Sequence, residues 1–158
     1  YRLASNGYEL HPDMWQLEEF LDDQAFALAP SALAKGLSLD YKCDPELVGV
    51  FDERLMTSVV GTAVYNALRF AKQQIRLSAE RQKDYLILAI EDDGPGFSDQ
   101  PKEDLSFEEM LSSHNTGLGL YFAELSAKAH SLGEKEGFVE KNRSKGLGGA
   151  QLLIFIPQ

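Results

Sequence analysis

Asp92, Gly94 and Gly96 form an Asp-x-Gly-x-Gly pattern that directly follows an apolar run at residues 85–90. A carboxylate at the end of a buried strand can accept a hydrogen bond from an exocyclic amine on a planar ring. The glycines let the chain turn sharply beside such a ring. The pattern therefore indicates a site for a flat, amine-bearing ligand such as adenine, although Asp-Gly and Pro-Gly pairs also make ordinary turns after strands.

Thr62, Asn66, Arg69 and Phe70 fall on one face of a helix predicted from a cap at Asp52 to about residue 71. At about 100° per residue they span an arc of about 100° that overlaps the helix's apolar stripe. A buried, unpaired amide costs about 1 to 3 kcal/mol, so inward-facing polar groups need partners. Ligand oxygens are one possibility; the other is that Asn66 bonds nearby backbone while Arg69 extends into solvent.

Thr116, Gly117, Leu118 and Gly119 open a third predicted helix. Free N–H groups at a helix N-terminus attract phosphate through hydrogen bonds and the helix dipole. The alternative is a flexible hinge with Thr116 as helix cap. Residues 97–114 lack a regular apolar period, and we expect a long functional loop there.

The remaining periodicities predict helices alternating with strands. An amphipathic helix follows Pro12 and ends at Lys35-Gly36, and helical spacing also continues after residue 117. This order predicts an α/β two-layer sandwich, with about three helices on one face of a mixed sheet of about five strands. The expected strands and turns are a strand at 37–41, a hairpin from 75–77 to 85–90 around a turn at 81–84, a strand at 138–139, a turn at 142–149 and a strand at 151–156.

Composition restricts the class of partner. The 158 residues carry a net charge of −10, which disfavours nucleic acid and anionic membranes as partners. The single Cys43 excludes an internal disulfide and fits a reducing compartment. No apolar run approaches the roughly 20 residues needed to span a bilayer. We expect one cytoplasmic, monomeric domain at residues 1–158. Because it begins at Tyr1, we expect a fragment of a longer protein, and anchoring of that protein in the inner membrane stays open.

The three histidines have different expected roles. None is followed by an acidic residue. We expect structural roles for His11 and His130, with His130 closing the third helix. His114 lies in the long loop, where contact with phosphate is an alternative.

Together, these motifs resemble the ATPase domain shared by sensor histidine kinases, DNA gyrase, ninety-kilodalton heat-shock chaperones and mismatch-repair ATPases, known as the Bergerat fold. The similarity runs from about residue 13 to Pro157 and is greatest to bacterial sensor histidine kinases. The segments that carry it are residues 65–70, similar to the N box, residues 92–97, similar to the G1 box, and residues 116–120, similar to the G2 box.

The resemblance implies ATP and Mg²⁺ as ligands and assigns a role to each matching residue. Asn66 would bind Mg²⁺, Arg69 the phosphates, Phe70 the adenine or ribose, and Asp92 the adenine N6 amine. Gly94, Gly96 and Phe97 would shape the base pocket. Thr116, Gly117, Leu118 and Gly119 would form the phosphate-facing end of a lid over about residues 97–116, anchored by Phe107.

Two positions depart from the family pattern. Thr62 stands where kinases carry Asn and ATP-hydrolysing relatives carry Glu, and Asn115 stands where Gly usually begins the G2 box. Threonine is a poor general base, which weakens an ATPase reading more than a kinase reading. The resemblance implies transfer of the γ-phosphoryl group to a histidine on an absent dimerisation domain, and from there signalling to a response regulator. The alternatives are a degenerate nucleotide-sensing or protein-docking module, or an ATPase or serine kinase of the same superfamily.

Overall fold

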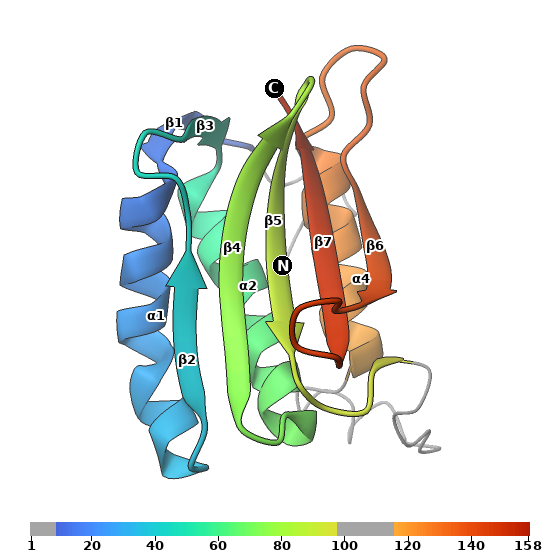
Figure 1. Cartoon of the computed structure of the whole chain (residues 1–158). Helices are drawn as coiled ribbons and strands as arrows, with labels where there is room; N and C mark the ends of the chain where they lie inside the picture. Colours follow the sequence, from blue (N-terminus) through green and yellow to red (C-terminus); the bar gives the residue numbers. More distant parts are fainter. Residues whose placement is uncertain (1–8, 98–115) are drawn as a thin grey trace.

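The structure is a computed structural model that describes residues 9–97 and 116–158. Three helices lie behind a five-stranded mixed sheet, and a small two-stranded sheet sits at one end of the layers (Figure 1). This arrangement confirms the predicted α/β two-layer sandwich. The elements are β1 (Asp13–Gln16), α1 (Leu17–Ala34), β2 (Ser38–Lys42), β3 (Val48–Phe51), α2 (Glu53–Phe70), β4 (Gln74–Gln82), β5 (Tyr85–Asp92), α4 (Thr116–Ala129), β6 (Phe138–Arg143) and β7 (Ala150–Pro157).

The large sheet has the strand order β2-β4-β5-β7-β6. β2 runs parallel to β4, and the other neighbours are antiparallel. β5 lies in the centre and is buried from Leu86 to Ile90, as its continuous apolar run predicts. Because β7 pairs with β5 in the register Glu91↔Gln151, the start of β7 lies beside Asp92.

The predicted β4–β5 hairpin is present, but its turn is shorter than expected. The strands pair up to Gln82↔Tyr85, so only Lys83 and Asp84 form the loop. Lys83 has a φ of 53°, the left-handed backbone that tight two-residue turns require. The polar residues at 81 and 82 therefore belong to β4.

The first helix begins later than Pro12. Asp13–Gln16 forms β1, which pairs with β3 in an antiparallel two-stranded sheet, so Met14 is a strand residue and is 65% exposed. α1 starts at Leu17, where the side chain of Gln16 accepts a hydrogen bond from the backbone N–H of Glu19. Its end before Lys35-Gly36 is as predicted, and Gly36 has a φ of 71°.

α2 starts as predicted. The side chain of Asp52 accepts a hydrogen bond from the backbone N–H of Leu55 at 3.0 Å, which caps the helix. The buried face of α2 packs on the sheet together with α1, and its core residues are fully buried. These residues are Leu55, Met56, Val59, Val60, Val64, Ala67 and Leu68.

α4 faces the core with small side chains. Ala123, Ser126 and Ala127 are buried, whereas the larger apolar side chains of Phe122 and Leu125 are only half-buried. Small residues let a neighbouring segment come close. A Cβ added at Gly137 would lie 1.7 Å from the carbonyl oxygen of Ala127.

The C-terminal hairpin is longer than predicted. β6 continues to Arg143, so the turn covers residues 144–149 and not 142–149. Within the described residues, no helix is both long enough and apolar enough to cross a membrane.

Candidate functional site

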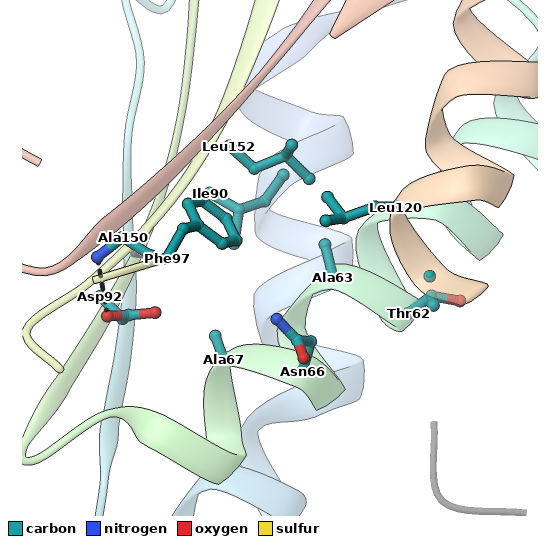
Figure 2. A pocket seen from close by; sticks show the side chains of 11 residues that line it. Thr62, Ala63, Asn66, Ala67, Ile90, Asp92, Phe97, Leu120, Ala150 and Leu152 are labelled. Atoms are coloured by element: carbon teal, nitrogen blue, oxygen red, sulfur yellow. Dashed lines mark hydrogen bonds between the residues drawn. The ribbon is translucent and has the colours of Figure 1, made fainter. Parts of the chain in front are cut away.

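A cavity lies between α2, the end of β5, the start of β7 and the start of α4. It has an empty volume of about 380 Å³, which includes its opening to solvent. Figure 2 shows Asp92 on one side of this space and Thr62 and Asn66 of α2 on the other. The cavity therefore brings together Asn66 and Asp92, which are separated in sequence by the end of α2 and two strands. Its lining residues are Thr62, Ala63, Asn66, Ala67, Ile90, Asp92, Phe97, Gly119, Leu120, Ala150 and Leu152.

Asp92 is held rigidly at the end of β5. Its Oδ1 accepts hydrogen bonds from the backbone N–H groups of Gly94 at 2.9 Å and Ala150 at 3.1 Å. The residue is 3% exposed. Figure 2 shows the second carboxylate oxygen directed toward the cavity.

Burial raises the pKa of Asp92, while the hydrogen bonds from Gly94 and Ala150 act against this increase and the charge of Asp93 adds to it. A carboxylate buried in this way gains from a ligand that donates a hydrogen bond to it. The geometry thus gives Asp92 both a fixed position and an acceptor oxygen for a ligand.

Glycines surround Asp92 because the chain packs too tightly for side chains. A Cβ at Gly94 would lie 2.4 Å from the carbonyl oxygen of Phe70. A Cβ at Gly149 would lie 2.4 Å from Asp92 Oδ1 and 2.5 Å from Gly94 N. Gly94 and Gly96 therefore shape the turn behind Asp92, and neither of them lines the cavity itself.

Asp93 supports the same turn from the other side. Its carboxylate accepts hydrogen bonds from the backbone N–H groups of Lys72, Gln73 and Gln74, at distances of 2.8 to 3.2 Å. Burial acts to raise the pKa of Asp93, yet these hydrogen bonds lower it below its ordinary value. The side chain thus ties the segment after α2 to the end of β5.

α2 presents Asn66 and Thr62 to the cavity one turn apart. The Thr62 hydroxyl donates a hydrogen bond to the carbonyl oxygen of Ser58 at 2.9 Å, within the same helix. The methyl group of Thr62 packs near Gly119, where an added Cβ would lie 3.0 Å away. The predicted inward position of both side chains is confirmed.

Arg69 and Phe70 do not line the cavity, so the inward position is wrong for Phe70, and for Arg69 the alternative of a side chain extending into solvent is correct. Arg69 is exposed, and its guanidinium lies 5.3 Å from the centre of the Phe70 ring. Phe70 is half-buried at the last residue of α2. Of the four residues on the predicted helix face, only Thr62 and Asn66 line the cavity.

The lid is mostly outside the described residues. Phe107, His114 and Asn115 fall in the gap, and the predicted lid contacts there stay predictions. Thr116, Gly117 and Leu118 form the first turn of α4, as predicted, and Gly119 reaches the cavity wall. Phe97, at the other end of the predicted lid, also lines the cavity.

The two described histidines have structural contacts. The backbone N–H of His11 donates to Asp52 Oδ2 at 3.0 Å. His130 is 4% exposed and directly follows α4; its Nε2 accepts a hydrogen bond from the backbone N–H of Asp52 at 3.0 Å. The ring contacts of His130 fit the structural role expected for it, whereas His11 is exposed and makes a backbone contact, so its expected role stays a prediction.

The apolar walls of the cavity were not predicted from the sequence. Ile90, Leu120, Ala150 and Leu152 have no chemistry of their own and read as ordinary core positions. Ala150 could have been found only from the β5–β7 register, which places it next to Asp92. These residues give the cavity apolar walls between Asp92 on one side and Thr62 and Asn66 on the other.

Residues 51–158 match the family described as "Histidine kinase-, DNA gyrase B-, and HSP90-like ATPase". The chain belongs to this family. The match covers α2, the Asp92 turn, α4 and the C-terminal hairpin, which are the parts that enclose the cavity.

Two sensor kinases of Escherichia coli K12 are similar in sequence. Sensor histidine kinase CpxA is 30% identical over 148 residues, which cover 88% of this chain and 30% of CpxA. Sensor protein PhoQ is 28% identical over 149 residues, which cover 92% of this chain and 29% of PhoQ. The similarity to sensor histidine kinases is thus confirmed, and the chain spans less than a third of these relatives' length.

Two solved structures share the fold. The ATP binding domain of PrrB from Mycobacterium tuberculosis superposes with a TM-score of 0.68 at 22% identity, covering 95% of this chain and 98% of that domain. Full-length ShkA, solved in complex with AMPPNP, gives a TM-score of 0.74 at 20% identity, covering 99% of this chain and 33% of ShkA.

Proposed function

We propose that this chain is the ATP-binding catalytic domain of a sensor histidine kinase and that its cavity binds Mg·ATP. The observation that supports this most directly is the pairing of Asp92 and Asn66 across one apolar cavity. A buried carboxylate at one end suits an amine, and an amide at the other suits a hydrated cation or phosphate. An adenine nucleotide presents these groups in that order.

Asp92 would select the base. Adenine donates from its N6 amine to the free carboxylate oxygen, whereas guanine presents a carbonyl oxygen at that position and would face an acceptor. A buried acceptor left unpaired costs about 1 to 3 kcal/mol, so the site favours adenine. Ile90, Phe97 and Leu152 would bury the faces of the ring.

Asn66 would hold the magnesium ion. An amide oxygen is a hard ligand that Mg²⁺ accepts, so the residue fits the role. Among the described residues, no group of three or more His, Cys, Asp or Glu side chains could hold a metal, so phosphates and water would supply the remaining ligands. When bound, Mg²⁺ neutralises phosphate charge. Arg69, which is exposed in the last turn of α2, and the N-terminus of α4 would add positive potential toward the phosphates.

The reaction that we propose is transfer of the γ-phosphoryl group to a histidine on a dimerisation domain of the full-length kinase. That histidine would then pass the phosphoryl group to a response regulator. Phosphoryl transfer depends mainly on positioning and charge neutralisation, so it does not need a base at position 62. The names of CpxA and PhoQ as sensor proteins support this proposal.

The proposal is tested by mixing this domain with γ-labelled ATP and the histidine-bearing hairpin of the full-length kinase. We expect label on the hairpin histidine, and none when Asn66 is replaced by Ala. A hairpin that stays unlabelled, while the domain binds ATP, would favour a nucleotide-sensing or docking module instead.

One observation bears on the alternative that the chain is an ATPase. The Thr62 hydroxyl is bonded to Ser58 O at 2.9 Å within the helix, so its proton is engaged there and the side chain offers no carboxylate to activate water. We expect a steady-state phosphate-release assay to detect no turnover above the spontaneous rate. Rapid release would overturn the kinase assignment in favour of an ATPase.

A further inference from the structure

β6 is an edge strand of the large sheet, and it places two cationic side chains against the start of the predicted lid. Lys141 and Arg143 are two residues apart on this strand, so they project from the same face. Lys141 Nζ lies 6.0 Å from the centre of the Phe97 ring. Arg143 contacts the residues just before Phe97. The segment Pro95–Phe97 thus runs across two adjacent cations.

Arg143 joins two loops with one planar group. Its Nη1 donates to the carbonyl oxygen of Gly148 at 2.7 Å, and its Nη2 donates to the carbonyl oxygen of Pro95 at 3.1 Å. Gly96 has a φ of 90°, and a Cβ there would lie 2.8 Å from Nη2. The guanidinium therefore packs against the backbone of the Asp92–Gly96 turn.

The second loop is itself tied to Asp92. Gly149 N–H donates to the carbonyl oxygen of Asp92 at 3.0 Å, and Ser144 N–H donates to Gly149 O at 2.7 Å. The Ser144 hydroxyl also donates to the carboxylate of Glu91. The 144–149 turn and the Asp92–Gly96 turn are consequently connected by hydrogen bonds, and Arg143 adds one further bond to each turn.

We infer that Arg143, assisted by Lys141, is a positioning residue that holds Pro95–Phe97 as a wall of the nucleotide cavity. The inference rests on the proposed function for its effect on binding, but the contacts exist without ligand. Phe97 lines the cavity beside Asp92, so a shift of this segment would open the slot in which the base lies. An arginine suits the task because its planar fork donates to two acceptors at once, whereas a lysine offers a single charged centre.

Three variants test this role. Arg143→Gln removes the fork, Arg143→Lys keeps the charge but not the two-point contact, and Lys145→Gln removes one charge from an exposed position in the same turn. We expect Arg143→Gln to weaken ADP binding, measured by calorimetry without magnesium, about tenfold, which corresponds to about 1.4 kcal/mol. Arg143→Lys should recover only part of this loss, and Lys145→Gln should bind like the parent protein.

Amide hydrogen exchange on the ligand-free proteins separates this inference from the proposed function. In Arg143→Gln we expect faster exchange at Gly94 and Gly149, whose N–H groups bond Asp92, with unchanged exchange in β4 and α1. If the unmutated protein does not bind ADP, the proposed function fails. The exchange result still shows whether Arg143 holds the Asp92–Gly96 turn in place, because it is measured without ligand. Exchange and affinity equal to those of Lys145→Gln would overturn the inference. A uniform rise in exchange over the whole chain would also overturn it, because Arg143 would then be a general stability residue.

Discussion

The two oxygens of Asp92 have different surroundings, and this difference would let one residue serve both the fold and the proposed ligand. Oδ1 is bonded to Gly94 and Ala150, which fixes the side chain. The other oxygen faces the cavity (Figure 2). Burial raises the pKa of Asp92 despite these two hydrogen bonds, so a further hydrogen-bond donor would stabilise the charged carboxylate. An amine of the ligand would supply the missing partner.

Asn66 at the opposite end makes a separate prediction about the metal. We expect Asn66→Ala to bind ATP equally well with and without Mg²⁺, because the variant loses the amide oxygen that would bind the ion. Calorimetric titrations with ATP, in magnesium and in chelator, measure this.

Ser58→Ala is the matched control for Asn66→Ala. Ser58 lies on the same helix two turns earlier, is exposed and does not line the cavity. It should keep the magnesium dependence of the parent protein. Magnesium that still strengthens ATP binding to Asn66→Ala would refute the metal role.

Helical periodicity was sufficient to predict Thr62 and Asn66 but not Arg69. A helical wheel gives the angle of a side chain around the axis and ignores its height along the axis. Arg69 lies in the last turn of α2, beyond the cavity, next to the segment that Asp93 binds. Composition and periodicity could not reveal that the cavity ends before this turn.

Among the elements, the C-terminal hairpin contributes most to the site besides α2 and β5. Its turn packs against Asp92 through Gly149. The backbone N–H of Ala150, the first residue of β7, donates a hydrogen bond to the Asp92 carboxylate. The sequence predicted the hairpin from its turn residues and final apolar strand. It did not predict the contact with Asp92, because strand order and register depend on long-range packing.

Gly149→Ala tests this element. Its Cβ would lie 2.4 Å from Asp92 Oδ1 and 2.5 Å from Gly94 N, so the turn must move. Overpacking of this kind typically costs about 1 to 3 kcal/mol, and we expect ADP affinity to fall as well. Chemical denaturation and calorimetry provide the two measurements.

Gly146→Ala is the control in the same turn, because a Cβ there meets nothing within 4 Å. It should leave stability and affinity within experimental error of the parent protein. A Gly149→Ala protein that matched it in both measurements would show that the packing around Asp92 tolerates change.

The small β1–β3 sheet shows why short elements escape sequence analysis. Each strand has four residues, and Met14, Leu17 and Leu21 also fit a helical spacing. The backbone of Leu17 donates to Leu47 O at 3.0 Å, and Gln158 bonds Val50 through both of its amide atoms. These non-local contacts stabilise the strand form, and local periodicity carries no information about them.

On the scale of the whole molecule, His130 connects the end of α4 to the start of α2. Its Nδ1 bonds Ser126 O at 2.7 Å, and its Nε2 accepts from the backbone N–H of Asp52. Burial lowers the pKa of His130, although the Ser126 bond and the charge of Asp52 act to raise it. A proton on Nε2 would face the N–H of Asp52 and break this connection.

This arrangement predicts the direction of a pH effect on stability. Because the folded-state pKa lies below the ordinary value of 6.5, the unfolded chain binds the proton more readily. Neutral His130 contributes fully to the free energy of unfolding above about pH 6.5. This contribution is lost as the pH falls toward the lower pKa of the folded state, by at most about 1.4 kcal/mol per pH unit.

Denaturant unfolding between pH 8 and pH 5 measures this effect, with His130→Gln as the comparison. The variant should be less stable at pH 8 and should lose less stability on acidification than the parent protein. Equal pH profiles for the two proteins would mean that His130 is not the responsible group.

The most direct test of the whole account is calorimetric titration of Asp92→Asn with ATP. Asparagine keeps an acceptor oxygen for Gly94 and Ala150, so the fold should persist. The raised pKa of Asp92 means that its charge opposes folding once the pH exceeds that pKa, so the variant should be no less stable than the parent at pH 7. We predict that a folded Asp92→Asn protein loses detectable adenine nucleotide binding. A folded variant that binds ATP as tightly as the parent would contradict the account.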